Sequence, residues 1–163
     1  MGILRQTVEV IRPASTTAYS ANDVIGPVSG TSLITFDMPS DRVVISGAQV
    51  MSDQNWEPTQ ANLYLVTSSS YAPGADNAAL TVPVYADGPV TTLLMGPDIP
   101  GSRSLSAATF SILAGSIAVP FSVPASLTSH RIYAALQTST GFMPTSGQKF
   151  SVSLFFEDAL GRF

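Results

Sequence analysis

The chain has 163 residues, of which 45% are hydrophobic, and it contains 12 Gly, 12 Pro and no Cys. A domain of this length buries about 70% of the surface that its unfolded chain exposes, so it needs no disulfide or structural metal to fold, and this composition excludes intrinsic disorder. The formal net charge is −4, and only 11% of the residues are charged, against about 25% in an average soluble domain.

Short runs rich in Val, Ile, Thr, Tyr and Phe recur along the chain between clusters of Gly, Pro, Ser, Asn and Asp, whereas helical periodicity is nearly absent. This pattern is typical of many short strands. In chain order, it predicts strands at 5–12, 32–37, 42–52, 61–67, 79–85, 107–113, 116–122, 131–138 and 149–157. Strands of this number favour an all-β fold with two packed sheets.

We expect at most one short helix, for which residues 87–95 are the candidate, because Asp87 can cap it and Pro89 is tolerated in a first turn. We find no repeat and no linker between compact blocks, so we expect a single β-sandwich domain over 1–163. Residues 1–4 and 159–163 would be short terminal arms, of which at least one would dock on a neighbouring molecule.

The last predicted strand alternates most clearly. Because side chains alternate across a strand, Phe150, Val152, Leu154 and Phe156 should face the core, and Phe155 should lie on the opposite face among Ser151, Ser153 and Glu157. The same reading places Tyr64, Val66 and Tyr133 on second faces of their sheets, where a loop or a partner can cover them.

The surface chemistry excludes several classes of partner. The seven basic residues are dispersed, whereas nucleic-acid binding requires clustered Lys and Arg, so we expect no direct nucleic-acid contact. The first residues lack the apolar stretch of a signal peptide, and no run is long enough to span a membrane. We therefore expect no membrane association.

Few residues could carry catalysis or bind a metal. His130 is the only His, so an imidazole base or a catalytic triad would have to use it, but no Gly-x-Ser-x-Gly motif is present and an exposed loop His is the simpler interpretation. The acidic residues do not have the dense spacing of a calcium loop, and there is no glycine-rich phosphate loop. We expect no catalytic residue, no metal ligand and no cofactor.

The only Trp, Trp56, lies in a polar loop between two predicted strands. A ring there can stack on a carbohydrate, anchor a protein interface or fold back over the end of the sandwich. The abundance of Ser and Thr favours an interface, since hydroxyl groups lose less on desolvation than ionised side chains do.

Several segments resemble small structural proteins of tailed bacteriophages. They are RPASTTAYSANDVIG at 12–26, LYL at 63–65, DNAA at 76–79 and GFMPTSG at 141–147, and the resemblance extends from about residue 5 to 157. The first of them is fairly specific.

This resemblance implies a jelly-roll-like sandwich on the outer surface of the virion, acting as a capsid cement or decoration protein that is made in the host cytoplasm. It implies the major capsid protein as partner and a homo-oligomer, either dimer or trimer. The candidate interface residues are Ile3, Leu4, Trp56, Phe155, Leu160 and Phe163. The alternatives are a carbohydrate- or receptor-binding module of a phage tail or fibre, which would use Trp56, and a hydrolase centred on His130.

Overall fold

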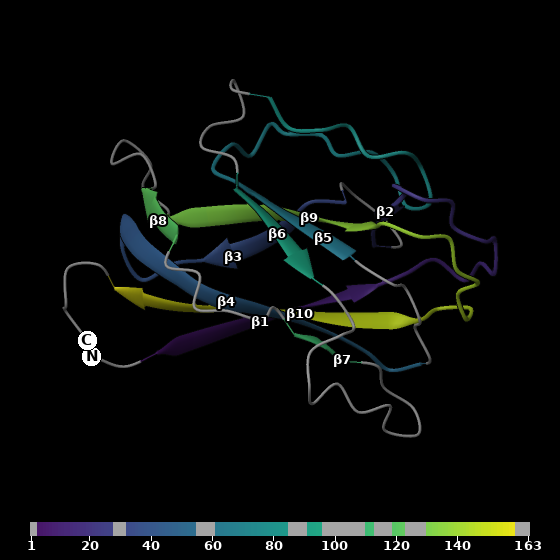
Figure 1. Cartoon of the computed structure of the whole chain (residues 1–163), viewed down its shortest axis with the longest axis horizontal. Coiled ribbons are helices and arrows are strands. Elements are labelled where there is room, and N and C mark those ends of the chain that lie inside the picture. The colour runs from purple at the N-terminus through teal and green to yellow at the C-terminus, as the bar shows by residue number, and fades with distance from the viewer. Residues whose placement is uncertain are drawn as a thin grey trace.

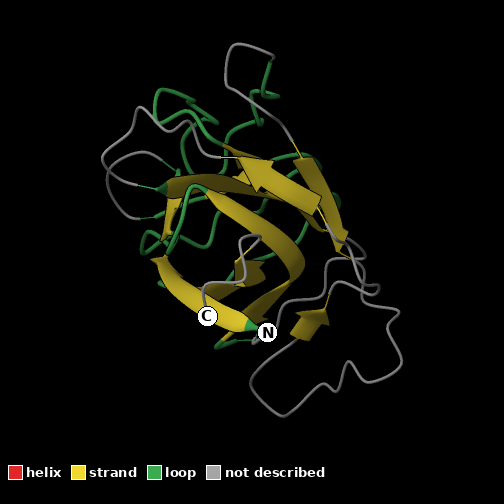
Figure 2. Cartoon of the chain, turned by 90° about the vertical axis from the view of Figure 1, so that its left-hand side faces the viewer, coloured by secondary structure: helices red, strands yellow, loops and turns green. Residues whose placement is uncertain are grey.

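The computed structural model describes residues 3–27, 32–54, 61–84, 91–95, 110–112, 119–122 and 130–158, which form two antiparallel sheets (Figure 1). The first sheet contains β1 (Leu4–Ile11), β10 (Lys149–Asp158), β4 (Arg42–Ser52), β7 (Phe110–Ile112) and β8 (Val119–Ser122). The second contains β2 (Val24–Ile25), β3 (Ile34–Asp37), β9 (Arg131–Thr138), β5 (Ala61–Val66) and β6 (Thr91–Met95). The described residues contain no helix (Figure 2).

The order of the strands is jelly-roll-like. Spatially the first sheet runs β1, β10, β4 and then β7 and β8, which pair with successive parts of β4. The second runs β2 and β3, which together pair with β9, followed by β5 and β6. The chain therefore changes sheet repeatedly and returns with β10 between β1 and β4, as in a double-sheet jelly roll. The expected all-β sandwich is confirmed.

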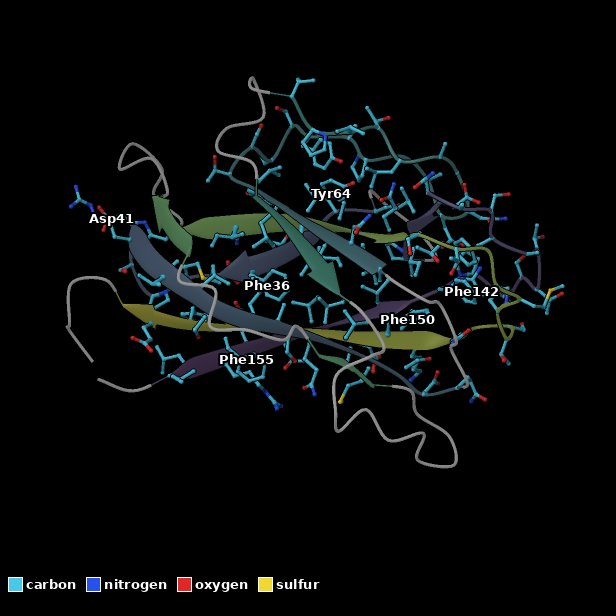
Figure 3. All side chains as sticks on the ribbon, in the orientation of Figure 1. Phe36, Asp41, Tyr64, Phe142, Phe150 and Phe155 are labelled. Atoms are coloured by element: carbon cyan, nitrogen blue, oxygen red, sulfur yellow. The ribbon has the colours of Figure 1, made fainter. Side chains whose placement is uncertain are left out.

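The inward faces of the sheets form one core. Its fully buried members include Phe36, Leu63, Leu65, Ile132 and Leu136 from the second sheet, and Val43, Ile45, Val50, Phe150, Val152 and Leu154 from the first. Phe36 and Phe150 lie between the layers, and Phe155 lies on the other side of β10 (Figure 3). The alternation predicted for residues 149–157 is therefore correct.

A bulge in β4 interrupts that strand's alternation. Phe155 is opposite Gly47 and Phe156 is opposite Ile45, so Ser46 is the extra residue. Val43 and Ile45 face the core before the bulge, and Ala48 and Val50 face it after. A bulge changes which residues point inward, and this change keeps both halves of a long strand packed on one core.

Two sequence predictions are wrong. Residues 91–95 of the predicted helix form β6, which pairs with β5, while 85–90 lie outside the described residues. Here β-branched Thr91 and Thr92 and an available sheet edge favour a strand over a short helix. The predicted strand at 79–85 has only an isolated bridge, between Ala79 and Asp23, within its described part. Pro83 cannot donate to a strand ladder, and this segment instead crosses over a sheet.

Candidate functional site

The outer face of the first sheet is the surface that carries Phe155. Its described side chains come from β1, β10 and β4 and include Arg5, Thr7, Glu9, Ile11, Val44, Gln49, Met51, Lys149, Ser151, Ser153, Phe155 and Glu157. Only Ser153 among them is fully buried, between its neighbours in the sheet. The face therefore combines one aromatic ring with small hydroxyl groups and with the charged side chains of Arg5, Glu9, Lys149 and Glu157.

Phe155 is half-buried, and its own sheet supplies part of its cover. It lies between Arg5 on β1 and Gly47 on β4 in the register. A Cβ on Gly47 would be 3.7 Å from the Phe155 Cδ2 atom, so the ring packs against the backbone at the bulge. Since Gly47 has no side chain, the ring of Phe155 is flanked on that side by backbone alone, and it remains partly exposed.

Polar side chains on this face make one hydrogen bond and one exposed ion pair with each other. The hydroxyl oxygens of Thr7 and Ser153 are 2.7 Å apart, and Lys149 Nζ is 3.7 Å from Glu9 Oε1 in an exposed ion pair. Beside them is a shallow depression of about 260 Å³, lined by Glu9, Met51, Ser52, Asp53, Lys149 and Ser151. Exposed pairs of this kind contribute about 0–1 kcal/mol to stability. A partner that covers the pair must compensate the hydration that both charges lose.

The other predicted interface residues are placed as follows. Ile3 has 63% of its surface exposed and directly precedes β1. Leu4 is the first residue of β1 and packs against the core, so it is part of the sandwich and not of a free arm. Trp56, Leu160 and Phe163 lie outside the described residues.

The outer face of the second sheet differs, because the chain covers it. Tyr71 packs on Val66 and Ala135, with Leu80 and Tyr133 beside them. The Tyr71 hydroxyl donates to the carbonyl of Thr81 at 2.6 Å, which ties the covering segment together. This segment, residues 67–84, runs over β5 and β9 (Figure 1). The expectation that Val66 and Tyr133 are covered is therefore met within one chain.

A buried polar cluster closes one end of the sandwich. Asp76 Oδ2 accepts from Arg12 Nη2 at 3.1 Å, and Asp76 Oδ1 accepts from the amide of Gly26 at 2.9 Å. The Tyr19 hydroxyl donates to Asp76 Oδ1 and accepts from Arg12 Nε. Burial, followed by the hydrogen bond to Asp76 and its negative charge, raises the pKa of Tyr19 well above its usual range. The Tyr19 ring stacks on Phe142 with the centroids 4.7 Å apart.

Three of the four segments singled out in the sequence, 12–26, 76–79 and 141–147, meet at this cluster. Val24 N donates to Ala78 O at 2.8 Å, Asn77 N to Val24 O at 2.9 Å, and Tyr19 N to Phe142 O at 2.9 Å. The 12–26, 76–79 and 141–147 segments are thus in contact, although they are far apart in the chain. Sequence reasoning identified these segments but missed the Arg12–Asp76 pair, because no local spacing links residues 64 positions apart.

His130 is half-buried next to β9 and not the exposed loop residue that we expected. Its Nδ1 atom is buried and has no hydrogen-bond partner within the described ranges. In those same ranges no group of three or more acidic, His or Cys side chains is arranged to hold a metal, and no helix is long and apolar enough to cross a membrane.

Comparisons with protein families, with curated proteins and with solved structures find no match to this chain.

Proposed function

We propose that this protein is a non-enzymatic structural protein of a tailed-bacteriophage virion. In this role it is a cement or decoration subunit that binds the major capsid protein on the outer surface of the head, after synthesis in the host cytoplasm. The resemblance of residues 12–26, 76–79 and 141–147 suggests the virion. The jelly-roll-like fold is compatible with it, although this fold also serves other functions.

The observation that carries the proposal is the difference between the two outer faces. On the second sheet, the chain's own segment buries Val66 and Ala135 completely. On the first sheet, Phe155 stays half-buried between Arg5 and Gly47. The ring and the hydroxyl groups of this sheet can be desolvated at low cost, whereas Arg5, Glu9 and Lys149 on the same face require opposite charges on the partner.

The mechanism of stabilisation is mass action. A subunit that binds the assembled lattice and not the free capsid protein shifts the equilibrium towards the assembled shell. Contacts that are weak individually become effective when they repeat over the lattice. No bond is made or broken, and no cofactor is required.

The test uses virions of the phage that encodes the chain. We expect mass spectrometry of purified particles to detect the protein in a copy number comparable to that of the capsid subunit, and cryo-EM to place it on the outside of the head. Its absence from the particles would refute the proposal, and so would a position restricted to the tail.

A binding assay tests the surface. We expect purified Phe155→Asp protein to lose binding to capsids that lack the subunit, and Ser69→Asp protein to retain it. Ser69 is exposed on the segment that covers the second sheet, so it receives the same charge on the opposite side of the molecule. Equal binding by both variants would show that the outer face of the first sheet is not the contact.

Two further experiments address residues outside the described part. Deletion of 159–163, which removes Leu160 and Phe163, should weaken capsid binding while leaving the fold intact. A glycan array compared with Trp56→Ala tests the alternative of a carbohydrate- or receptor-binding tail module. Specific glycan binding that is lost in Trp56→Ala would favour that alternative over the capsid subunit.

A further inference from the structure

β1 forms one edge of the first sheet, and what we infer from this edge is independent of the capsid proposal. β1 spans eight residues and pairs with β10 without a register shift. Within the described part of the chain, no strand pairs with its other edge. Among the strands at the edges of the two sheets, β1 is the longest, since β2, β3, β6, β7 and β8 span two to five residues.

An edge of this kind is normally protected. Proteins shorten edge strands or protect them with Pro, with charged side chains (Lys above all) or with a bulge, because unpaired backbone groups accept a strand from another molecule. β1 has two charged side chains, Arg5 and Glu9. β1 contains no Pro and no Lys, and its pairing with β10 has no bulge. The backbone N–H and C=O groups on this edge can therefore pair with another strand.

The outward side chains of residues 3–11 form a self-complementary series. In order they are Ile3, Arg5, Thr7, Glu9 and Ile11. If a second copy pairs antiparallel with Thr7 opposite Thr7, then Arg5 is opposite Glu9 and Ile3 is opposite Ile11. Each of these cross-strand pairs is favourable: opposite charges, two threonines, and two apolar side chains.

The exposed fractions agree with this register. Ile3 is 63% exposed and Ile11 is 41% exposed, and both are among the few large hydrophobic side chains that are exposed in the described residues. The pairing would cover both of them. The only ion pair of Glu9 among the described residues is the exposed contact with Lys149 at 3.7 Å, which a closer Arg can share or replace.

The inward side chains support the same register. Leu4 would lie opposite Val10, and Gln6 opposite Val8. The Gln6 Oε1 atom is buried and has no hydrogen-bond partner among the described residues. In this pairing the Gln6 side chain of the second copy is a diagonal neighbour, which long side chains can reach. The second amide can then donate to the atom that lacks a partner.

We propose that a second copy of this chain binds along β1 as an antiparallel strand, with Thr7 opposite Thr7, so that the first sheets of two molecules form one continuous sheet in a symmetric dimer. Main-chain hydrogen bonds provide the affinity, and the alternate side chains select the partner and the register. The symmetry is two-fold about an axis at Thr7, because the pairs Arg5–Glu9 and Ile3–Ile11 each occur twice with the roles exchanged.

Charge reversal tests whether a second copy binds along β1 through the Arg5–Glu9 pairs. In sedimentation of the full chain at up to about 100 μM, a range that detects even a weak dimer, we expect twice the monomer mass. Arg5→Glu places like charges opposite each other at two positions and should weaken the dimer about tenfold or more. The double variant Arg5→Glu/Glu9→Arg restores opposite charges and should recover the dimer. Arg42→Glu makes the same charge change at the start of β4, away from this edge, and should have no effect.

A cysteine cross-link tests the register. The chain has no Cys, and residues directly opposite in an antiparallel pair have Cα atoms about 4.5–5.5 Å apart, within the range of a disulfide. Thr7→Cys should form a covalent dimer on mild oxidation, and Ser151→Cys, on the next strand inward, should not. A monomer at all concentrations, a dimer insensitive to Arg5→Glu, or no cross-link through Thr7→Cys would each overturn the proposal.

Discussion

Asp76 holds together the buried polar cluster at one end of the sandwich. Its carboxylate faces the Arg12 guanidinium, whose side chain is fully buried, and also accepts from Tyr19 and Gly26. Removing one partner of a buried ion pair leaves an uncompensated charge, which is the costly case. The exposed pair between Asp37 and Arg131, at 2.7 Å, is the natural comparison within the same chain.

We predict that Asp76→Asn lowers the free energy of unfolding by about 3–5 kcal/mol, since the Arg12 charge stays buried without a counter-charge. Asp37→Asn removes the same charge from an exposed pair and should cost less than about 1 kcal/mol. Denaturant titration of both variants against the unchanged protein measures the difference. Similar losses in the two variants would mean that Arg12 finds another partner.

The titration of Tyr19 should make the free energy of unfolding depend on pH in the alkaline range. Its pKa in the folded protein is raised, chiefly by burial, above the value of about 10 in an unfolded chain. The folded state therefore retains a proton that the unfolded state loses. This contribution to stability is fully present below about pH 10 and is lost as the pH rises further.

We expect the free energy of unfolding to fall above about pH 10, with Tyr19 contributing up to about 1.4 kcal/mol per pH unit. Tyr19→Phe should be less stable at neutral pH, because Asp76 loses a donor, but should show a shallower alkaline decrease. Denaturation curves at neutral and alkaline pH measure both effects. An identical alkaline slope in the two proteins would contradict the assignment to Tyr19.

At the scale of the element, two adjacent phenylalanines of β10 lie on opposite faces of the first sheet, one in the core and one on the outer face. Phe156 has 4% of its surface exposed within the core, whereas Phe155 is half-buried on the outer face. A one-residue slip in register would exchange these roles, since side chains alternate across the strand.

Phe156→Asp should unfold the domain, because it places a charge in the core at a cost of several kcal/mol. Phe155→Asp should keep the β-type circular dichroism and lose about 2 kcal/mol or less, since its ring is only partly buried. Thermal melts followed by circular dichroism distinguish the two. Unfolding by both variants would show that the strand is buried on both faces.

The strands also show where local pattern fails as a predictor. The faces of β9 and β10 could be predicted, because alternation is a property of adjacent residues. Residues 91–95 could not be assigned correctly, since the choice between helix and strand there depends on pairing with β5. The bulge at Ser46 and Gly47 was missed for the same reason, because only the register with β10 defines it.

At the scale of the whole molecule, the two sheets have different exteriors. The covering segment makes the second sheet part of a three-layered arrangement, in which Tyr71 is 3% exposed and packs on Val66 and Ala135. The first sheet lacks such a layer among the described residues. The chain therefore covers the outer face of the second sheet itself, and the outer face of the first sheet is the one that we propose for a partner.

We predict that Tyr71→Ala loses about 3 kcal/mol of stability through the cavity under the covering segment. Tyr71→Phe, which keeps the ring and removes only the hydrogen bond to the Thr81 carbonyl, should lose about 1 kcal/mol. Hydrogen exchange should show faster opening of residues 67–84 in the first variant than in the second. Equal effects would mean that the hydroxyl, and not the ring, holds the segment.

The candidate site was predictable in part. Phe155 was recognisable because an aromatic residue among Ser151, Ser153 and Glu157 departs from the polar pattern of a solvated face. The self-complementary order of residues 3–11 is also present in the sequence, but it has meaning only once β1 is known to be an edge strand.

The sequence alone determined the strand-rich fold, the inward faces of the clearest strands and the low surface charge, because all of these depend on residue type and on neighbours one or two positions away. Only the tertiary structure decided which strands pair, that Arg12 meets Asp76 across 64 positions, and which outer face the chain covers. These depend on contacts between distant segments, and a local period of two residues carries no information about which segments come together.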